Sequence, residues 1–138
     1  MGRIINRLSV IAIGSFCLVG SAMAADMTGD EIKSTLSGKT IYLDLNAAGS
    51  ATGATGTGII YYAADGSALN KTPMGTIWHG TWTAKPDSLC VDWKEKPNNP
   101  CTKYVKDGDT ITLINVANGQ TRGKITKIAD GNAENLAP

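Results

Sequence analysis

The side chains best suited to chemistry in this chain are large aromatic rings grouped near its middle. Trp78 and Trp82 stand close together in "GTIWHGTWTA", and a third tryptophan and two tyrosines lie on either side of this stretch. Rings of this size either fill the core of a small β-domain or line a pocket for an apolar or planar ligand. Both interpretations are open at this point, and the candidate ligand-binding residues are Trp78, Trp82, Trp93, Tyr61 and Tyr62.

His79, the one histidine of the chain, lies between these tryptophans. Alternate side chains of a strand face opposite sides, so Trp78 and Trp82 would share one face and His79 would lie on the other. A single imidazole without a second protein ligand nearby is a weak site for haem or a metal ion. The sequence therefore predicts no metal site and no cofactor.

The residues also give little support to catalysis. No serine stands in a nucleophile-elbow motif, and "KDGDT" is explained by a hairpin turn that lacks the further oxygen ligands of a calcium loop. Asp87 and Asp92 flank one short strand on opposite faces, which does not suit a shared acid–base site. We therefore expect a protein that is not an enzyme and has no catalytic residues.

The amino terminus indicates export. Arg3 and Arg7 precede the apolar run "LSVIAIGSFCLVG", which ends at a small-x-small cleavage pattern formed by Ala22 and Ala24. A lipoprotein signal at Cys17 is a weaker alternative, because bulky Phe16 precedes the cysteine. We expect a signal peptide at residues 1–24, a single domain at residues 25–138, and a periplasmic or secreted location.

Export determines how the remaining cysteines are interpreted. Two cysteines, Cys90 and Cys101, remain after the signal peptide is removed. An exported chain enters a compartment that oxidises thiols, so this pair predicts a disulfide that contributes about 3 kcal/mol to stability. The sequence has no C-x-x-C motif, which is the pattern that would indicate a redox pair or a thiolate metal site. Loss of the two signal arginines takes the formal net charge from +1 to −1, so we expect no nucleic-acid partner and no membrane partner after signal cleavage.

The elements that must position these side chains begin with a short helix in "MTGDEIKSTLSGKT". Thr28 and Glu31 have the spacing of a capping box, and Met27 and Ile32 have that of a hydrophobic staple. Gly38 supplies a left-handed helix stop.

After this helix the period of the apolar residues changes to that of β-strands, first in "TIYLDL". The glycine-rich stretch 46–58 predicts a flexible loop that does not pack. Asp-Gly and Asn-Gly pairs then predict two-residue hairpins. Together the segments predict a mainly β fold, a meander of about eight antiparallel strands that closes into a small barrel-like sheet. The three pairs are Asp65-Gly66, Asp107-Gly108 and Asn118-Gly119.

Strand register predicts which face of this sheet is the core. A turn centred on Asp107-Gly108 would place Tyr104 opposite Ile111. If Cys90 lies across from Cys101, the disulfide falls on the face opposite to the core. The core face then holds Leu89, Val91, Trp93, Tyr104, Ile111 and Leu113.

The segments "LSGKTI", "YYAADG", "GTWTA" and "SLCVDW", with the second cysteine, resemble a family of small exported domains of unknown function in Gram-negative bacteria. Members open with a short helix and carry a G-x-W, L-C-x-x-W and Cys series, and the resemblance covers most of the chain after the signal. The chain is also loosely similar to bacterial periplasmic protease inhibitors, which are small disulfide-bearing β-barrels with a G-x-W strand. This second similarity implies a protein-binding role.

We therefore expect a non-catalytic binding module that holds a small apolar or planar ligand in an aromatic-lined barrel. The alternative is a periplasmic protein-binding or protease-inhibitor-like domain that acts through its loops 47–58 and 94–100. An enclosed cavity would favour the ligand, and a filled interior would favour the protein partner.

Overall fold

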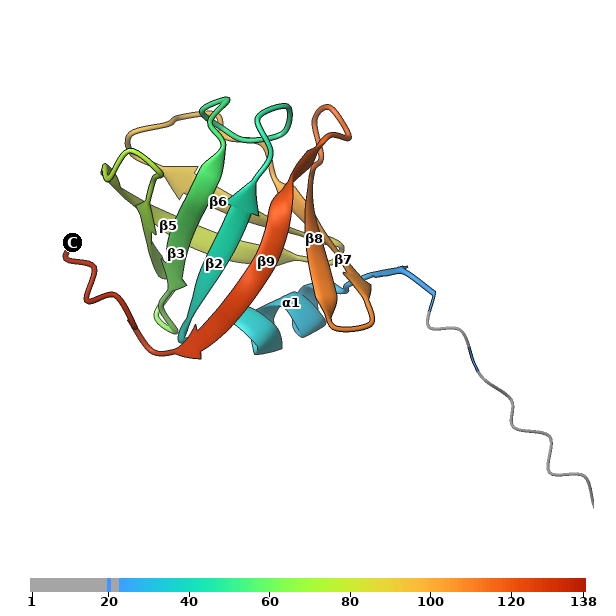
Figure 1. The fold of residues 1–138 in the computed structure, drawn as a ribbon. Helices are drawn as coiled ribbons and strands as arrows, with labels where there is room; N and C mark the ends of the chain where they lie inside the picture. Colours follow the sequence, from blue (N-terminus) through green and yellow to red (C-terminus); the bar gives the residue numbers. More distant parts are fainter. Residues whose placement is uncertain (1–19, 21–22) are drawn as a thin grey trace, which may run out of the picture.

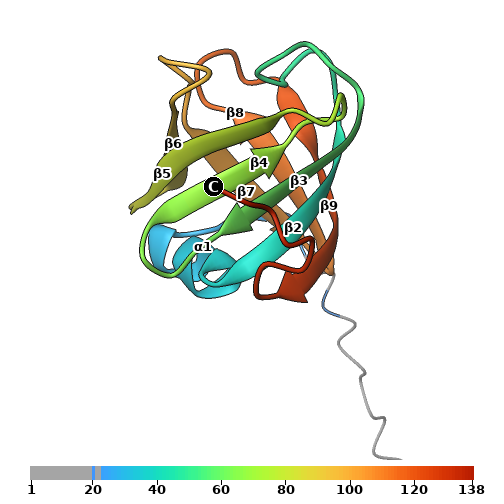
Figure 2. The same ribbon diagram turned by 90° about the vertical axis from the view of Figure 1, so that its left-hand side faces the viewer.

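The computed structural model describes residue 20 and residues 23–138, so most of the predicted signal peptide at 1–24 lies outside the described residues. The described chain forms an antiparallel β-barrel with a short helix below it (Figures 1 and 2). The elements are β1 (Ala25–Asp26), α1 (Gly29–Leu36), β2 (Lys39–Leu45), β3 (Gly56–Tyr62), β4 (Ser67–Lys71), β5 (Ile77–Lys85), β6 (Ser88–Trp93), β7 (Thr102–Asp107), β8 (Thr110–Asn115) and β9 (Thr121–Asp130).

The barrel confirms the predicted fold class. Strands β2 to β9 follow one another around the sheet as a meander, and β9 returns to pair with β2. Strand β1 lies outside this circle and pairs with the end of β7. Closure leaves each barrel strand with a neighbour on both sides, which removes the exposed edges of an open sheet.

Helix α1 covers one end of the barrel (Figures 1 and 2) and contacts β2, β5 and β6. Its apolar side consists of Ile32 and Leu36, which are both fully buried in the core. The predicted capping box is present, since Thr28 N–H donates to Glu31 Oε2 at 2.7 Å and Glu31 N–H donates to Thr28 Oγ1 at 3.3 Å. Gly38 follows the helix with a φ of 72°, as the predicted stop requires.

Replacing Thr28 by alanine should lower the free energy of unfolding by about 1 kcal/mol, because it leaves an orphan amide at the helix start. Chemical denaturation would measure the change. Ser34→Ala, at an exposed position of the same helix, is the matched control. An unchanged free energy of unfolding would contradict this structural role for the cap.

The turns differ from the prediction at all three glycine pairs. Asp107 pairs with Thr110, so the two-residue loop is Gly108-Asp109, with Gly108 at a φ of 58°. A glycine at the first loop position is typical of a type II′ turn, whereas a loop formed by Asp-Gly itself would be typical of type I′. The other two pairs lie in longer connections, residues 63–66 and 116–120, where each glycine takes the positive φ.

This change of turn shifts the β7–β8 register by two residues, so Tyr104 lies opposite Leu113 and not Ile111. A shift of two keeps every side chain on its predicted face, because side chains alternate with a period of two. The predicted core face is therefore buried as expected, and it consists of Leu89, Val91, Trp93, Tyr104, Ile111 and Leu113.

The predicted disulfide pair is present on the outside of the barrel wall. The Sγ atoms of Cys90 and Cys101 lie at bonding distance, and the two Cα atoms are 4.3 Å apart. Beside this pair, β6 and β7 share a single ladder position, Leu89 opposite Thr102. The cysteine pair thus joins two strands that have little backbone pairing of their own.

Candidate ligand cavity in the barrel

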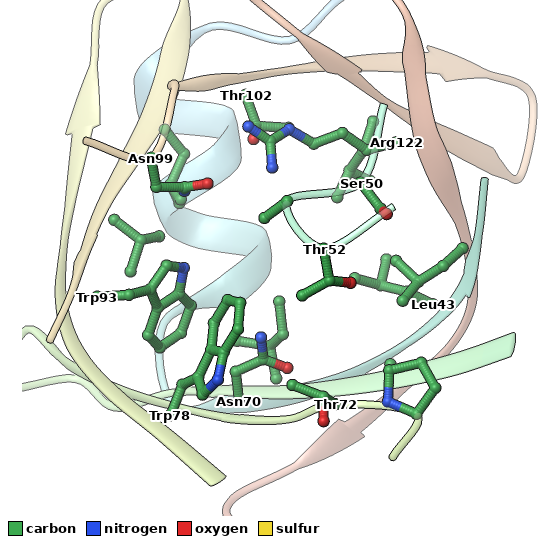
Figure 3. Close-up of a pocket in the computed structure, with 18 of the residues that line it drawn as sticks. Leu43, Ser50, Thr52, Asn70, Thr72, Trp78, Trp93, Asn99, Thr102 and Arg122 are labelled. Atoms are coloured by element: carbon green, nitrogen blue, oxygen red, sulfur yellow. The ribbon is translucent and has the colours of Figure 1, made fainter. Parts of the chain in front are cut away.

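A cavity of about 80 Å³ lies inside the barrel, at the end opposite to helix α1 (Figure 3). Its walls come from strands on all sides of the barrel, and part of its rim comes from residues 50–52 of the glycine-rich loop. Thr52 and Pro73 at the rim are exposed to solvent, so the cavity reaches the surface there. At the other end, Ile32 and Leu36 of α1 belong to the packed core.

The glycine-rich loop does not behave as predicted. Its last residues, 56–58, belong to β3, and the rest folds over the mouth of the barrel. Ser50 Oγ donates to the carbonyl of Ala54 at 3.1 Å, and Ala51 packs against the core. Gly49 lies so close to β9 that a Cβ atom would be 2.3 Å from the carbonyl oxygen of Thr121. The small residues thus permit close packing, although their composition predicted a loop that does not pack.

Trp78 and Trp93 form an aromatic wall of the cavity (Figure 3). Their ring centroids are 6.2 Å apart and the rings are tilted by 58°. Gly80 makes room for this arrangement, because a Cβ atom there would lie 2.7 Å from Cε3 of Trp93. Two large aromatic rings therefore line the empty space.

The other candidate residues have different places. Tyr62 lines the cavity from β3, whereas Trp82 packs in the core without lining the cavity, with its ring centroid 5.6 Å from that of Tyr62. The indole N–H of Trp82 donates to the carbonyl of Ala63 at 2.8 Å. Tyr61 faces outward, opposite Leu69, beneath the carboxyl-terminal segment that buries Leu136.

His79 also faces outward, as the alternation within β5 predicted. Its Nδ1 lies 2.6 Å from Oε1 of Glu95, and its backbone N–H donates to Oε2 at 2.8 Å. These hydrogen bonds, with His79 as the partner, hold the pKa of the exposed Glu95 carboxyl below its usual value. The imidazole is therefore part of a surface hydrogen-bonded contact with Glu95, on the opposite side of the wall from the cavity.

The cavity also has polar residues that the sequence patterns did not identify. Arg122 of β9 reaches into it, with Asn99 and Thr102 nearby (Figure 3). Regular alternation along β9 would turn Arg122 outward, since its neighbour Gly123 and then Ile125 face the core. Leu113 pairs with Gly123 and Ile114 pairs with Thr121, which makes Arg122 an extra, bulged residue. A β-bulge re-aims a side chain, and here it buries the arginine.

The guanidinium of Arg122 is only partly satisfied. Arg122 is 8% exposed, and its Nη2 donates to the carbonyl of Pro100 at 2.8 Å. Among the described residues, Nε has no hydrogen-bond partner and no carboxylate forms an ion pair with the side chain. Burial lowers the pKa of Arg122, yet a guanidinium stays charged in proteins.

Two buried phenols share this cavity. The hydroxyls of Tyr62 and Tyr104 are 3.3 Å apart, and both residues are almost fully buried. Burial raises the pKa of Tyr62 to about 12 and raises that of Tyr104 well above its usual range. Both phenols are therefore neutral near pH 7, and each keeps an O–H that can donate a hydrogen bond.

Within the described residues there is no cluster of three or more histidine, cysteine or acidic side chains that could hold a metal ion. None of the helices in that part of the chain has the length and apolar character needed to cross a bilayer. Comparisons of the chain with models of known protein families, with curated proteins and with solved structures find no match. The cavity itself is therefore the main guide to function.

Proposed function

We propose that this protein is an exported, non-catalytic binding module that holds a small apolar or planar ligand in its barrel cavity. The observation that carries this proposal is the cavity of about 80 Å³ beside Trp78 and Trp93. A filled barrel would need no such space, since protein interiors are normally packed with few voids larger than a water molecule. The cysteine pair suits the oxidising compartment that the amino terminus predicts.

The size of the cavity limits what it can enclose. An apolar cavity of about 150 Å³ in another protein binds benzene, so this cavity suits a group of a few heavy atoms. A longer ligand would place one end inside and leave the remainder at the mouth, where Thr52 and Pro73 are exposed. Ring stacking and dispersion against the two indoles would supply most of the affinity for the enclosed part.

The direct test is native mass spectrometry of the protein purified from its own cells, compared with the mass after denaturation. We expect a bound species of low mass that is lost on unfolding. If the native and denatured proteins have the same mass and no added small molecule binds, the proposal fails. Binding of a protein partner at the exposed loop residues Lys94 to Asn98 is then the better hypothesis.

Trp78→Phe tests the role of the aromatic wall. We expect affinity for the bound species to fall severalfold, because a smaller ring leaves a gap beside the ligand, while the fold is kept. Trp82→Phe is the matched control, since Trp82 is equally buried but does not line the cavity. It should lower the melting temperature through the lost bond to Ala63 and leave affinity unchanged. Equal effects of both variants on affinity would contradict this assignment.

A further inference from the structure

The polar side of the cavity deepens the proposed function, and its role in recognition rests on the barrel being a ligand site. Arg122 carries a full positive charge into the barrel, is 8% exposed, and finds no carboxylate partner within the described part of the chain. An ion removed from water without a counter-ion is costly, and buried charges in proteins are normally paired. The cavity beside the guanidinium is therefore the natural place for an anionic counter-ion.

We propose that the ligand carries a carboxylate, which binds to the guanidinium of Arg122 inside the barrel. Several free hydrogen-bonding positions suit such a group. Nε of Arg122 has no partner among the described residues, and it belongs to the planar donor fork that matches a carboxylate. Thr102, which carries a hydroxyl, also lines the cavity.

Asn99 supplies a second unsatisfied position at the rim. Its Oδ1 is buried and has no hydrogen-bond partner in the described chain, although it faces the cavity (Figure 3). In this orientation it accepts a hydrogen bond from a ligand hydroxyl or amide, and a half-turn of the side-chain amide would instead present two donors. The cavity is thus lined by two residues from separate segments, each with a buried polar atom that has no partner among the described residues. These atoms are Nε of Arg122 and Oδ1 of Asn99.

The arrangement also orients the ligand. Arg122 is close to the start of β9 and Asn99 lies in the loop after β6, so both belong to the mouth end of the barrel. Trp78 and Trp93 form the aromatic wall of the same space. A molecule with one carboxylate and one apolar or aromatic portion, partly enclosed and partly at the mouth, would contact both sides at once. A purely apolar molecule would leave the arginine desolvated and unpaired.

A structural role for Arg122 makes a different prediction. Nη2 donates to the carbonyl of Pro100, so the side chain could serve only to fix the 94–100 loop. In that case its replacement would lower stability and leave ligand selectivity unchanged. A role in anion binding would instead appear as a change in the preference between charged and neutral ligands.

The experiment compares two carboxylates with their uncharged isosteres, namely benzoate with benzamide and hexanoate with hexanamide. Affinities are measured by calorimetry and by the fluorescence of the tryptophans. For the wild-type protein we expect the carboxylates to bind about tenfold or more tightly, as charge-assisted hydrogen bonds imply. In Arg122→Met this preference should disappear, and in Arg122→Lys part of it should remain. Lys124→Met, which removes a charge from an exposed position of the same strand, should keep it in full.

Each other result would be decisive. Equal binding of carboxylate and amide by the wild-type protein would overturn the inference and leave the binding module intact. If none of the four probes binds, the species found in protein from its own cells decides. An anion bound there supports the inference, and a neutral or cationic molecule overturns it. If no small molecule is bound there either, the proposed function fails and the inference fails with it.

Discussion

Replacing both Cys90 and Cys101 by serine is expected to lower the free energy of unfolding by about 2–5 kcal/mol, the usual range for a native disulfide in a small secreted domain. The structure places this loss at one seam of the barrel. Strands β6 and β7 share only the Leu89–Thr102 position, so the covalent link supports a junction with little backbone pairing. Other strand pairs have longer ladders, for example β2 with β3 over seven residue pairs.

Denaturant unfolding of the double variant would measure the stability, and amide hydrogen exchange would locate the loss. We expect exchange to rise first in β6, β7 and the loop between them, while β2 and β3 stay protected. Thr83→Ala is a control, because Thr83 is the exposed strand neighbour of Cys90. Two free thiols in protein from oxidising conditions, or equal stability of variant and parent, would contradict the prediction.

Leu36→Ala should have an effect of similar size, about 2–5 kcal/mol, through loss of buried contacts and the cavity left behind. Leu36 is fully buried where helix α1 meets the barrel, and only Ile32 and Gly29 are buried with it within that helix. A helix of eight residues has little stability alone, so its position depends on these contacts. Loss of one of them should loosen the cover over this end of the barrel.

The measurement is again the free energy of unfolding, with Lys33→Ala as the control on the exposed side of the same helix. That control should change stability by no more than about 0.5 kcal/mol. Leu36→Ala should also increase hydrogen exchange in α1 more than in β2. Similar unfolding energies for the two variants would show that the helix lies loosely against the barrel and contributes little.

Local patterns predicted the elements of this fold well, because each pattern depends on neighbours in the chain. The capping box at Thr28 and Glu31 needs only residues three apart, and it is present as predicted. The alternation that put His79 outside and Trp78 inside needs only a regular strand. The predicted β7–β8 register was wrong by two residues. Asp-Gly pairs occur in more than one turn geometry, so the sequence alone does not determine which two residues form the loop.

The interior of the cavity was harder to predict than its aromatic wall. A basic residue such as Arg122 on a strand is normally expected to be exposed. Its side chain is buried here because of the bulge at that position. The adjoining Gly123 was the available signal, since a glycine inside a strand pattern often marks a bulge or a close backbone approach. Whether Trp78 meets empty space depends on residues from many strands, and no local pattern contains that information.

Pairing of β2 with β9 joins Lys39 and Asp130, which are 91 residues apart in the chain. All other junctions around the barrel join consecutive strands, so they need only contacts that are close in sequence. The ring closes only when β9 arrives, and that strand also carries Arg122 into the cavity. The cavity thus depends on the last strand of the chain, and a product truncated before Thr121 would expose β2 and β8 as free sheet edges, through which separate molecules can aggregate.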